Sequence, residues 1–531
     1  MAKRPLACAT TRQLVRQLGL PSSLADRVRF SGSDPLPSTL HLGELAQALI
    51  ATTALAASHL RDLRIGDSDR PPSEIRIRCE DAVAEFRSEH VATLDGEKPF
   101  EWDRLAGAYR ARGESAWIRP HTNWEHHKRG FLDLLGLPAS ANRQDVASAV
   151  RSRDADELAE RAMQNGLVCT ALRSYAEWDA HSQGQAALAR ASRGPVRIDC
   201  VARDQSTPLP PLCDTRRPLE GVRVLDLTRV IAGPVAGRVL AGYGADVLWI
   251  TSSDLPALPG LDFDTARGKR SAYLDLRPSS SSDRHRLESL IRTADVLLQS
   301  YAPGALTRLG FGPDRVRELN PQIVYASLTA WGAVDVGGVT DGEADSGGPW
   351  RNRKGFDSLV QFASGIAHAE GMGVIAAKAH QVGEGSRMPS DADEFSPRQL
   401  PCQALDHGAG YLVASGIITA LARRHTQGGS YLVTTSLLDT AVLLRSLGSK
   451  LYRAPAGSRI ETAHELRARG RLGKCVGERG KQVEYVQHAA MFERGGIIVG
   501  WDKAPTGLGA DAAEWLPLPS EKHSGCADSS G

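Results

Sequence analysis

The stretch that decides the fold is Gly221-Val-Arg-Val-Leu-Asp-Leu-Thr-Arg-Val-Ile-Ala-Gly-Pro234. Its first half, residues 221–227, is a short apolar run without helical periodicity, which predicts a buried strand. After the loop 228–234, the small and apolar residues of 235–243 predict a helix, and a second apolar run follows at 247–250. A strand, a helix and a strand in this order require a parallel pair joined by a right-handed crossover.

The same alternation continues downstream. Further strands are predicted at 271–276, 294–299 and 323–328, with helices at 283–293 and 303–319 between them. This pattern predicts an α/β fold with a doubly wound parallel (Rossmann-like) sheet. Ligands of such a sheet gather beyond the carboxyl ends of its strands, so the residues that follow each strand are the candidates for a site.

Length and composition narrow the class of protein. The chain has 531 residues, more than one hydrophobic core normally holds, so two or more domains are expected. A net charge of +2 gives no argument for a nucleic-acid or anionic-membrane partner, and no apolar run is long enough to span a bilayer. Eight cysteines without CxxC spacing are typical of a reducing interior, and a cytoplasmic protein is expected.

The N-terminal residues leave a second subcellular location open. Lys3, Arg4, Arg12 and Arg16 precede the first acidic residue, Asp26, which is also typical of a mitochondrial targeting segment. A basic, frayed terminus is the simpler interpretation.

Changes in local composition and hydrophobic pattern divide the chain into six segments. They are a basic N-terminal tail (1–35), a degenerate half-repeat of the late core (36–92), a small α-rich domain (93–185), a linker (186–217), the α/β core (218–447) and a polar C-terminal region (448–531). The half-repeat is inferred because the small-residue helix predicted at 41–60 resembles that at 408–424, and each precedes a short strand and a further helix. The Gly- and acid-rich tracts 334–348 and 371–396 predict loop insertions.

Two loops of the core could bind an anion. Residues 229–234 precede a helix N-terminus, but they match neither GxGxxG nor GxxxxGK[ST]. Residues 265–271 place three cations, Arg267, Lys269 and Arg270, ahead of a strand. Such a turn suits the phosphates of a nucleotide-like ligand, or it is a solvated basic loop.

Asp406 stands at the mouth of the predicted helix that runs to Arg424. Asp is a favoured N-cap residue, so helix capping is one interpretation. The other is a carboxylate nucleophile at the helix end, with nearby backbone N–H groups stabilising developing oxyanions. The histidine-rich segment 121–127 lacks HExxH spacing and a second ligand cluster, so no metal site is predicted.

Several ordered stretches resemble the class III CoA-transferase family, also called CaiB/BaiF-like. They are 219–234, 240–247, 267–276, 294–306 and 355–359. The family includes formyl-CoA transferases, carnitine CoA-transferases and 2-methylacyl-CoA racemases. The resemblance covers about 219–447 and is weaker over 117–185, which is similar to the family's small domain but precedes the core here.

The resemblance implies that Asp406 is the catalytic aspartate. It implies CoA-binding roles for Ile231, Ala232, Leu274, Asp275, Leu276, Arg277, Ser300, Tyr301, Ala302, Arg308, Lys354, Gly355, Phe356 and Asp357. It also implies acyl-CoA and a carboxylic acid acceptor as substrates, with an aspartyl anhydride and an aspartyl-CoA thioester as intermediates. No permanently bound cofactor is expected, because the CoA thioester is a substrate.

The departures from the family pattern define the alternatives. Phe356 stands where racemases place a histidine, which favours transfer over the alternative of a 2-methylacyl-CoA racemase or epimerase. A second alternative is a non-catalytic CoA-ester-binding protein. In the half-repeat the position that corresponds to Asp406 falls near Gly43, so that copy is expected to have no catalytic activity. Because family members form interlocked homodimers, we expect either a homodimer or an internally fused pseudo-dimer.

Overall fold

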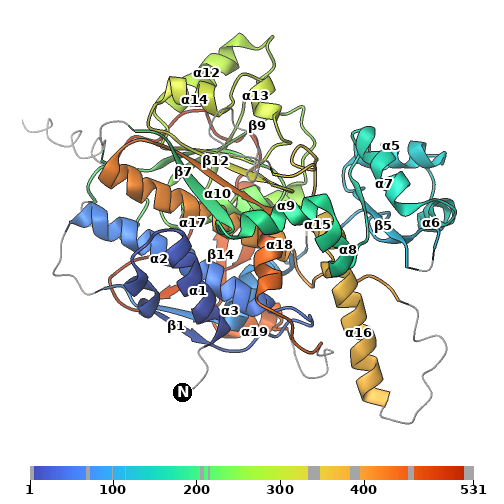
Figure 1. Cartoon of the computed structure of the whole chain (residues 1–531). Coiled ribbons are helices and arrows are strands. Elements are labelled where there is room, and N and C mark those ends of the chain that lie inside the picture. The colour runs from blue at the N-terminus through green and yellow to red at the C-terminus, as the bar shows by residue number, and fades with distance from the viewer. Residues whose placement is uncertain are drawn as a thin grey trace, which may run out of the picture.

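The computed structural model describes residues 5–66, 72–98, 100–113, 115–203, 208–212, 216–332, 347–382, 395–452 and 460–518. A large α/β body forms most of the molecule, and a smaller domain with helices α5, α6 and α7 lies beside it (Figure 1). Within the described ranges no helix is long and apolar enough to cross a membrane.

The large body is built on a seven-stranded sheet of order β10-β9-β8-β11-β12-β13-β7. Its strands are β7 (Val196–Ala202), β8 (Arg223–Leu227), β9 (Asp246–Thr251), β10 (Arg270–Tyr273), β11 (Val296–Gln299), β12 (Val324–Thr329) and β13 (Ser430–Ser436). Every neighbouring pair is parallel except β13 and β7. The predicted α/β fold with a doubly wound sheet is therefore confirmed, with one antiparallel edge strand added.

The sheet buries side chains on both faces. Val224 of β8 packs against the layer that contains α10 (Ala232–Gly242) and α17 (Ala404–Gln427). The next residue, Leu225, packs on the opposite face against α12 (Ser281–Arg292). Successive residues of a strand point to opposite faces, so an apolar run in the sequence is what a sheet covered on both sides requires.

The predicted helix 303–319 is instead two short helices, α13 (Ala305–Arg308) and α14 (Pro313–Leu319). Gly310 between them has a φ of 83°, a left-handed conformation that ends a helix. Pro313 then begins α14 at its first position.

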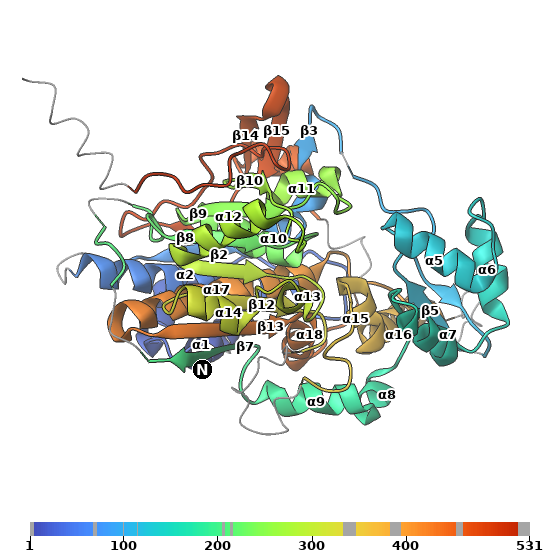
Figure 2. The same ribbon diagram turned by 90° about the horizontal axis from the view of Figure 1, so that it is seen from above.

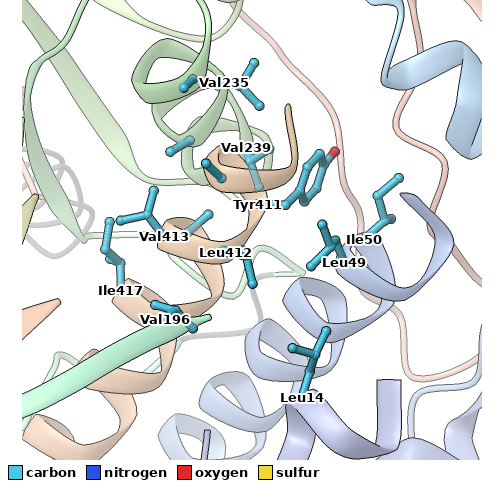
Figure 3. Close-up of a cluster of buried hydrophobic side chains, with 14 of the residues drawn as sticks. Leu14, Leu49, Ile50, Val196, Val235, Val239, Tyr411, Leu412, Val413 and Ile417 are labelled. Atoms are coloured by element: carbon cyan, nitrogen blue, oxygen red, sulfur yellow. The ribbon is translucent and has the colours of Figure 1, made fainter. Parts of the chain in front are cut away.

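Helix α17 is the centre of the large body. Its 24 residues are buried over most of their length, between α10 on one side and α2 (Leu42–Ile65) on the other. In Figure 3, Val413 of α17 lies on the side of Val239 of α10, and Leu49 of α2 lies on the other side of α17. A helix that is apolar all round is stable only inside such a core.

The N-terminal region repeats the order of elements around α17. Helix α2 also has 24 residues, and β2 (Ile75–Arg78), α3 (Cys79–Glu85) and α4 (Ser88–Val91) follow it. The expected frayed tail at 1–35 is wrong, because α1 (Leu6–Gln17), η1 (Ser22–Arg27) and β1 (Val28–Ser31) are folded there. Leu14 and Val15 of α1 are buried in the same core as α2, so burial of one apolar face orders this segment.

The small domain has its own hydrophobic core. Its elements are β4 (Tyr109–Arg110), β5 (Trp117–Pro120), β6 (Cys169–Ala171), α5 (Glu125–Leu135), α6 (Arg143–Arg151) and α7 (Ala155–Gln164). The three strands form an antiparallel sheet of order β4-β5-β6. Helices α8 (Tyr175–Ala180) and α9 (Ser182–Ala191) lead back to the large body, and the expected linker at 186–217 contains the edge strand β7.

The remaining described elements include strands near the C-terminus that pair with strands of the N-terminal region. They are β3 (Thr93–Leu94), α11 (Pro259–Thr265), α15 (Asp357–Ala363), α16 (Ile366–Val382), α18 (Leu437–Ser446), α19 (Ala463–Ala468), β14 (Leu472–Val476), η3 (Glu478–Gly480), β15 (Gln482–Val486) and β16 (Met491–Phe492). The C-terminal β15 pairs with β3 (Figure 2). Strand β16 pairs with β2.

Of the two expected loop insertions, 371–396 begins inside α16, and 334–348 lies largely outside the described residues.

Gly410 allows α17 to approach α10 closely. A Cβ at this position would lie 2.7 Å from the carbonyl oxygen of Ala232 and 2.8 Å from Cγ1 of Val235. We expect Gly410→Ala to lower the free energy of unfolding by about 1–3 kcal/mol, because the packed helices must separate. Urea unfolding measures this, with Ser282→Ala on the exposed surface of α12 as a control that should change stability by about 0.5 kcal/mol or less. An unchanged stability of Gly410→Ala would show that the two helices have room to move.

Candidate active site

The first turn of α17 is held by a carboxylate from another helix. Oδ2 of Asp357, the first residue of α15, accepts the backbone N–H of Leu405 at 2.9 Å and that of Asp406 at 3.0 Å. The amide of Gln361, one turn further along α15, donates to the other carboxylate oxygen of Asp357. Asp357 therefore takes the capping role that one interpretation of the sequence gave to Asp406.

Asp406 is the third residue of α17, and its side chain is left without a structural task. The residue is 9% exposed, and its carboxylate accepts no hydrogen bond from any described residue. Burial raises the pKa of Asp406 well above its usual value, and the negative charges of Asp357 and Glu89 raise this pKa further. A desolvated carboxyl group of this kind is more typical of a reactive group than of a helix cap.

Asp406 lies in the wall of a cavity of about 310 Å³. The loop after β8 contributes 229–232, the loop after β11 contributes 300–303, and residues 353–356 form a third side. These segments follow the carboxyl ends of parallel strands, where the fold predicts a ligand site. Trp124, His126 and His127 of the small domain complete the wall.

A second cavity, of about 270 Å³, adjoins the first, and Tyr301 and Ala305 line both. Apolar side chains such as Ile250, Leu255 and Leu306 form much of its wall. The two cavities together therefore form one extended site with a polar end at Asp406 and an apolar end beyond Tyr301.

The structure distributes the CoA-binding residues expected from the sequence over both cavities. Ile231, Ala232, Ser300, Tyr301, Ala302, Lys354, Gly355 and Phe356 line the first, and Leu274, Asp275, Leu276, Arg277 and again Tyr301 line the second. Two expected residues line neither. Asp357 is buried beneath Asp406, and Arg308 is exposed on α13 with its guanidinium near the carbonyl of Pro303.

The first cavity is rich in cations. Arg229, Arg353 and Lys354 line it, and Asp406 is the one acidic residue among its described lining residues. The guanidinium of Arg229 lies 4.9 Å from the centre of the Trp124 ring, so the small domain and the loop after β8 are in contact here. Such a lining favours anionic ligands.

Val230, in the same loop, has a φ of 73°, which is rare for a β-branched residue. Strained backbone of this kind costs about 1–3 kcal/mol and is concentrated at functional sites.

The basic turn 265–271 does not contribute to this site. Arg267 pairs with Asp264 at 2.8 Å, Lys269 with Asp226 at 2.8 Å, and all four side chains are buried. Both interpretations of this turn, as a phosphate site and as a solvated loop, are therefore wrong. The pairing of Lys269 with Asp226 joins residues 43 positions apart, so a local reading of the turn could not reveal it.

The backbone N–H groups at the mouth of α17 are also occupied. Those of Leu405 and Asp406 donate to Asp357, and that of His407 donates to the carbonyl of Gln403 at 3.0 Å. Contrary to the expectation from the sequence, these three N–H groups are therefore not free to stabilise an oxyanion.

The N-terminal region reaches the site through His407, the neighbour of Asp406. Nε2 of His407 lies 2.9 Å from a carboxylate oxygen of Glu89 on α4, and both side chains are buried. The ring of His407 also stacks on Phe86, with 5.5 Å between the ring centres. The residue beside Asp406 is thus held by a segment more than 300 positions upstream.

Sequence reasoning missed the contribution of the small domain to the site. Trp124 and His127 are buried in the cavity wall, and His121 packs directly behind it. The cluster of histidines at 121–127 was a visible signal, but its spacing pointed only to an unlikely metal site.

Comparison with known proteins identifies the family. Residues 219–468 match the model of CoA-transferase family III. The resemblance seen in the sequence is therefore confirmed for residues 219–468, which make up a little less than half of the chain and match this class of CoA-transferases.

Curated relatives carry acyl-CoA transferase names. The chain is 32% identical to the probable fatty acyl-CoA transferase Rv3272 of Mycobacterium tuberculosis, over 44% of this chain and 54% of that protein. It is 30% identical to a formyl-CoA:oxalate CoA-transferase of Rhodopseudomonas palustris, over 42% of this chain and 46% of the relative. The chain thus spans about half the length of these two relatives. A crystal structure of Rv3272 aligns with a TM-score of 0.32 over 43% of this chain and 56% of that one.

A third relative matches a longer part of the chain. Acetyl-coenzyme A transferase nodX of Hypoxylon pulicicidum is 28% identical over 481 residues, which cover 81% of this chain and 74% of the relative. This coverage exceeds what residues 219–531 alone supply, so the match extends into the N-terminal half.

The cap on α17 makes a testable contribution to stability. Asp357→Ala leaves the N–H groups of Leu405 and Asp406 buried without an acceptor, and we expect a loss of about 1–3 kcal/mol in the free energy of unfolding. Asp357→Asn keeps an oxygen acceptor at the same place, so its loss should be smaller. Urea unfolding of both variants tests this, and equal losses would mean that the hydrogen bonds do not hold the helix.

Proposed function

We propose that the chain is an acyl-CoA:carboxylate CoA-transferase in which Asp406 is the nucleophile. The observation that carries this proposal is the free carboxyl group of Asp406 in the wall of a cation-lined cavity, with the capping role taken by Asp357. A nucleophile in a covalent mechanism must have no competing structural bond and must be reachable by its substrate. Asp406 meets both conditions, and its family supplies the class of reaction.

The two adjoining cavities suggest how CoA would lie. We place the thioester in the first cavity at Asp406 and the adenine in the apolar second cavity, with the pantetheine arm passing Tyr301. Lys354 and Arg229 would face the negative charges of the ligand, and Arg277 stands at the far end of the second cavity. Ligand pockets commonly combine such an apolar lining with a few charged groups that fix orientation.

The reaction would proceed through exchange between activated carbonyl groups. The carboxylate of Asp406 attacks the thioester carbonyl of acyl-CoA, which forms a mixed anhydride and releases the CoA thiolate. The thiolate then attacks the aspartyl carbonyl, which gives an aspartyl-CoA thioester and frees the donor acid. The acceptor carboxylate next attacks this thioester, and the released thiolate takes the acceptor acyl group from the second anhydride, which restores the carboxylate of Asp406. Each step replaces one activated acyl bond by another, so no step requires a large uphill change.

The alternatives predict different behaviour. A racemase of this family would exchange the α-proton of a 2-methylacyl-CoA, and the position that its histidine would occupy holds Phe356, a side chain that cannot take a proton. A non-catalytic binding protein would bind CoA esters without any need for Asp406. Relatives of this chain are named as transferases, which supports transfer.

We infer that the N-terminal region supplies internally what a partner subunit would supply in a homodimer. Glu89 binds the neighbour of Asp406, and the small domain closes the cavity. At the corresponding end of α2 the carboxylate of Glu44 lies 3.5 Å from Nδ1 of His41, and it lines neither of the two cavities. There the N–H of Gly43 donates to Asp34, and Asp34 pairs with Lys450 at 2.6 Å. One catalytic centre for each chain is therefore proposed.

Covalent catalysis is tested directly by trapping. The protein is incubated with acetyl-CoA, succinyl-CoA or octanoyl-CoA, digested and analysed by mass spectrometry. We expect an acyl or CoA adduct on the peptide that contains Asp406, and its removal by hydroxylamine, because both intermediates are activated acyl groups. Adduct-free protein during continuous turnover would exclude Asp406 as a covalent nucleophile.

Asp406→Asn should separate activity from stability. We expect transferase activity to fall by about 10³-fold or more, since an amide is a poor nucleophile. The raised pKa of Asp406 in the folded state means that its stabilising contribution is complete below the unfolded pKa of about 3.9 and is lost as the pH rises through the folded pKa. Asn does not ionise, so the gain in Tm of the variant over the unmodified protein should grow from about pH 4 upward.

Thermal unfolding at a series of pH values measures this effect, with the exposed Asp314→Asn as a control that shows no such trend. A Tm gain that does not depend on pH would mean that Asp406 ionises in the folded state as easily as in the unfolded chain.

A further inference from the structure

His127 of the small domain carries a nitrogen that the fold leaves unused. Its side chain lines the same cavity as Asp406, and the residue is 4% exposed. Nε2 of this ring is buried and has no hydrogen-bond partner among the described residues. An unpaired buried polar atom is costly, and it is retained in a cavity wall where a ligand satisfies it.

The other nitrogen of the ring is fixed. Nδ1 of His127 lies 3.2 Å from Nδ1 of His121, and the ring of His121 stacks on Phe356 with 3.6 Å between centres and 8° between planes. Phe356 is followed directly by Asp357, which holds the N–H of Asp406. A continuous series of contacts therefore sets the position of the His127 ring relative to Asp406.

The contact between the two Nδ1 atoms determines where the protons of His121 and His127 lie. Burial, together with the nearby His126 and Lys354, lowers the pKa of His127 to about 4, and burial also lowers the pKa of His121 well below its usual value. Both rings are thus neutral near pH 7, and the short contact between the two Nδ1 atoms holds one proton. When His121 supplies that proton, the proton of His127 is on Nε2, where no described residue accepts it.

We propose that His127 binds a carboxyl-derived oxygen of the acyl donor or of the acceptor acid through Nε2–H, and so positions the carbonyl group against Asp406. This inference rests on the proposed transferase function, which supplies ligands whose oxygens are acceptors. A neutral donor suits both states of the substrate, the uncharged thioester and the carboxylate. His127 is a positioning residue that the small domain contributes to this cavity.

Two substitutions at one position separate the two nitrogens. His127→Asn keeps a polar group near the place of Nδ1, where it can still reach His121, but it has nothing at the place of Nε2. His127→Gln carries its amide nitrogen close to the place of Nε2 and gives up the contact with His121. His285→Asn, on the exposed surface of α12, is the matched control for the loss of a histidine.

The kinetic test uses acetyl-CoA as donor and acetate, oxalate or octanoate as acceptor. We expect His127→Asn to raise the KM for the acceptor acid about tenfold or more, since a hydrogen bond to a charged group is lost. The Kd for free CoA should change less than about twofold, because CoA alone has no acyl oxygen at this place. His127→Gln should recover part of the acceptor KM, and a merely structural role of the ring would not produce this recovery.

Three results would overturn the inference. The first is an acceptor KM of His127→Asn equal to that of His285→Asn. The second is an equal loss in CoA binding and in acceptor KM, which would indicate a general disturbance of the site. The third is α-proton exchange of a 2-methylacyl-CoA in deuterated buffer that is lost in His127→Asn, because His127 would then be a base.

The trapping of Asp406 distinguishes failure of the inference from failure of the function. If the unmodified protein forms the Asp406 adduct while the kinetics of the His127 variants are unchanged, only the role of His127 is wrong. If the unmodified protein forms no adduct and transfers CoA to none of the three acids, the proposed transferase function itself is wrong.

Discussion

The carboxylate of Asp357 bound to the first turn of α17 is the interaction on which the candidate site depends. A helix begins with N–H groups that need acceptors, and an acidic residue in its own first turn would ordinarily serve them. Here α15 supplies the acceptor. The carboxylate of Asp406 is therefore left without a hydrogen-bond donor among the described residues, although the residue is buried. Burial of this carboxylate raises its pKa. The carboxylate stays buried because α10 and α2 hold α17 in place along its length.

The N-terminal region is bonded to the core of the large body through buried polar groups. Glu85 of α3 bonds the hydroxyl group of Tyr411, and Ser88 of α4 bonds Asp264, which pairs with Arg238 of α10. These groups are buried, and removal of one partner would leave an uncompensated charge in the core. These buried contacts therefore fix α3 and α4 of the N-terminal region against α10 and α17.

Local patterns in the sequence predicted the sheet, because each parallel strand is an apolar run that is buried on both faces. They left Asp406 open between a helix cap and a nucleophile, because Asp357, which caps α17, is 49 residues away and invisible to a local rule. The basic turn was misread for a related reason, because Asp226, the partner of Lys269, lies on β8, 43 residues away. The helix predicted at 303–319 failed where Gly310 takes a left-handed conformation that periodicity does not reveal.

The site is assembled from parts that are stable for different reasons. The small domain has its own core, whereas its contact with the large body includes the stacking of His121 on Phe356 and the contact of Trp124 with Arg229. A ligand in the first cavity touches both bodies, so its binding free energy adds to the docking of one on the other. Loss of the ligand removes that contribution but leaves each core intact. The docking of the small domain beside Asp406 is therefore the part of the molecule whose stability is most closely coupled to a bound ligand, and the packing of α17 between α10 and α2 does not depend on it.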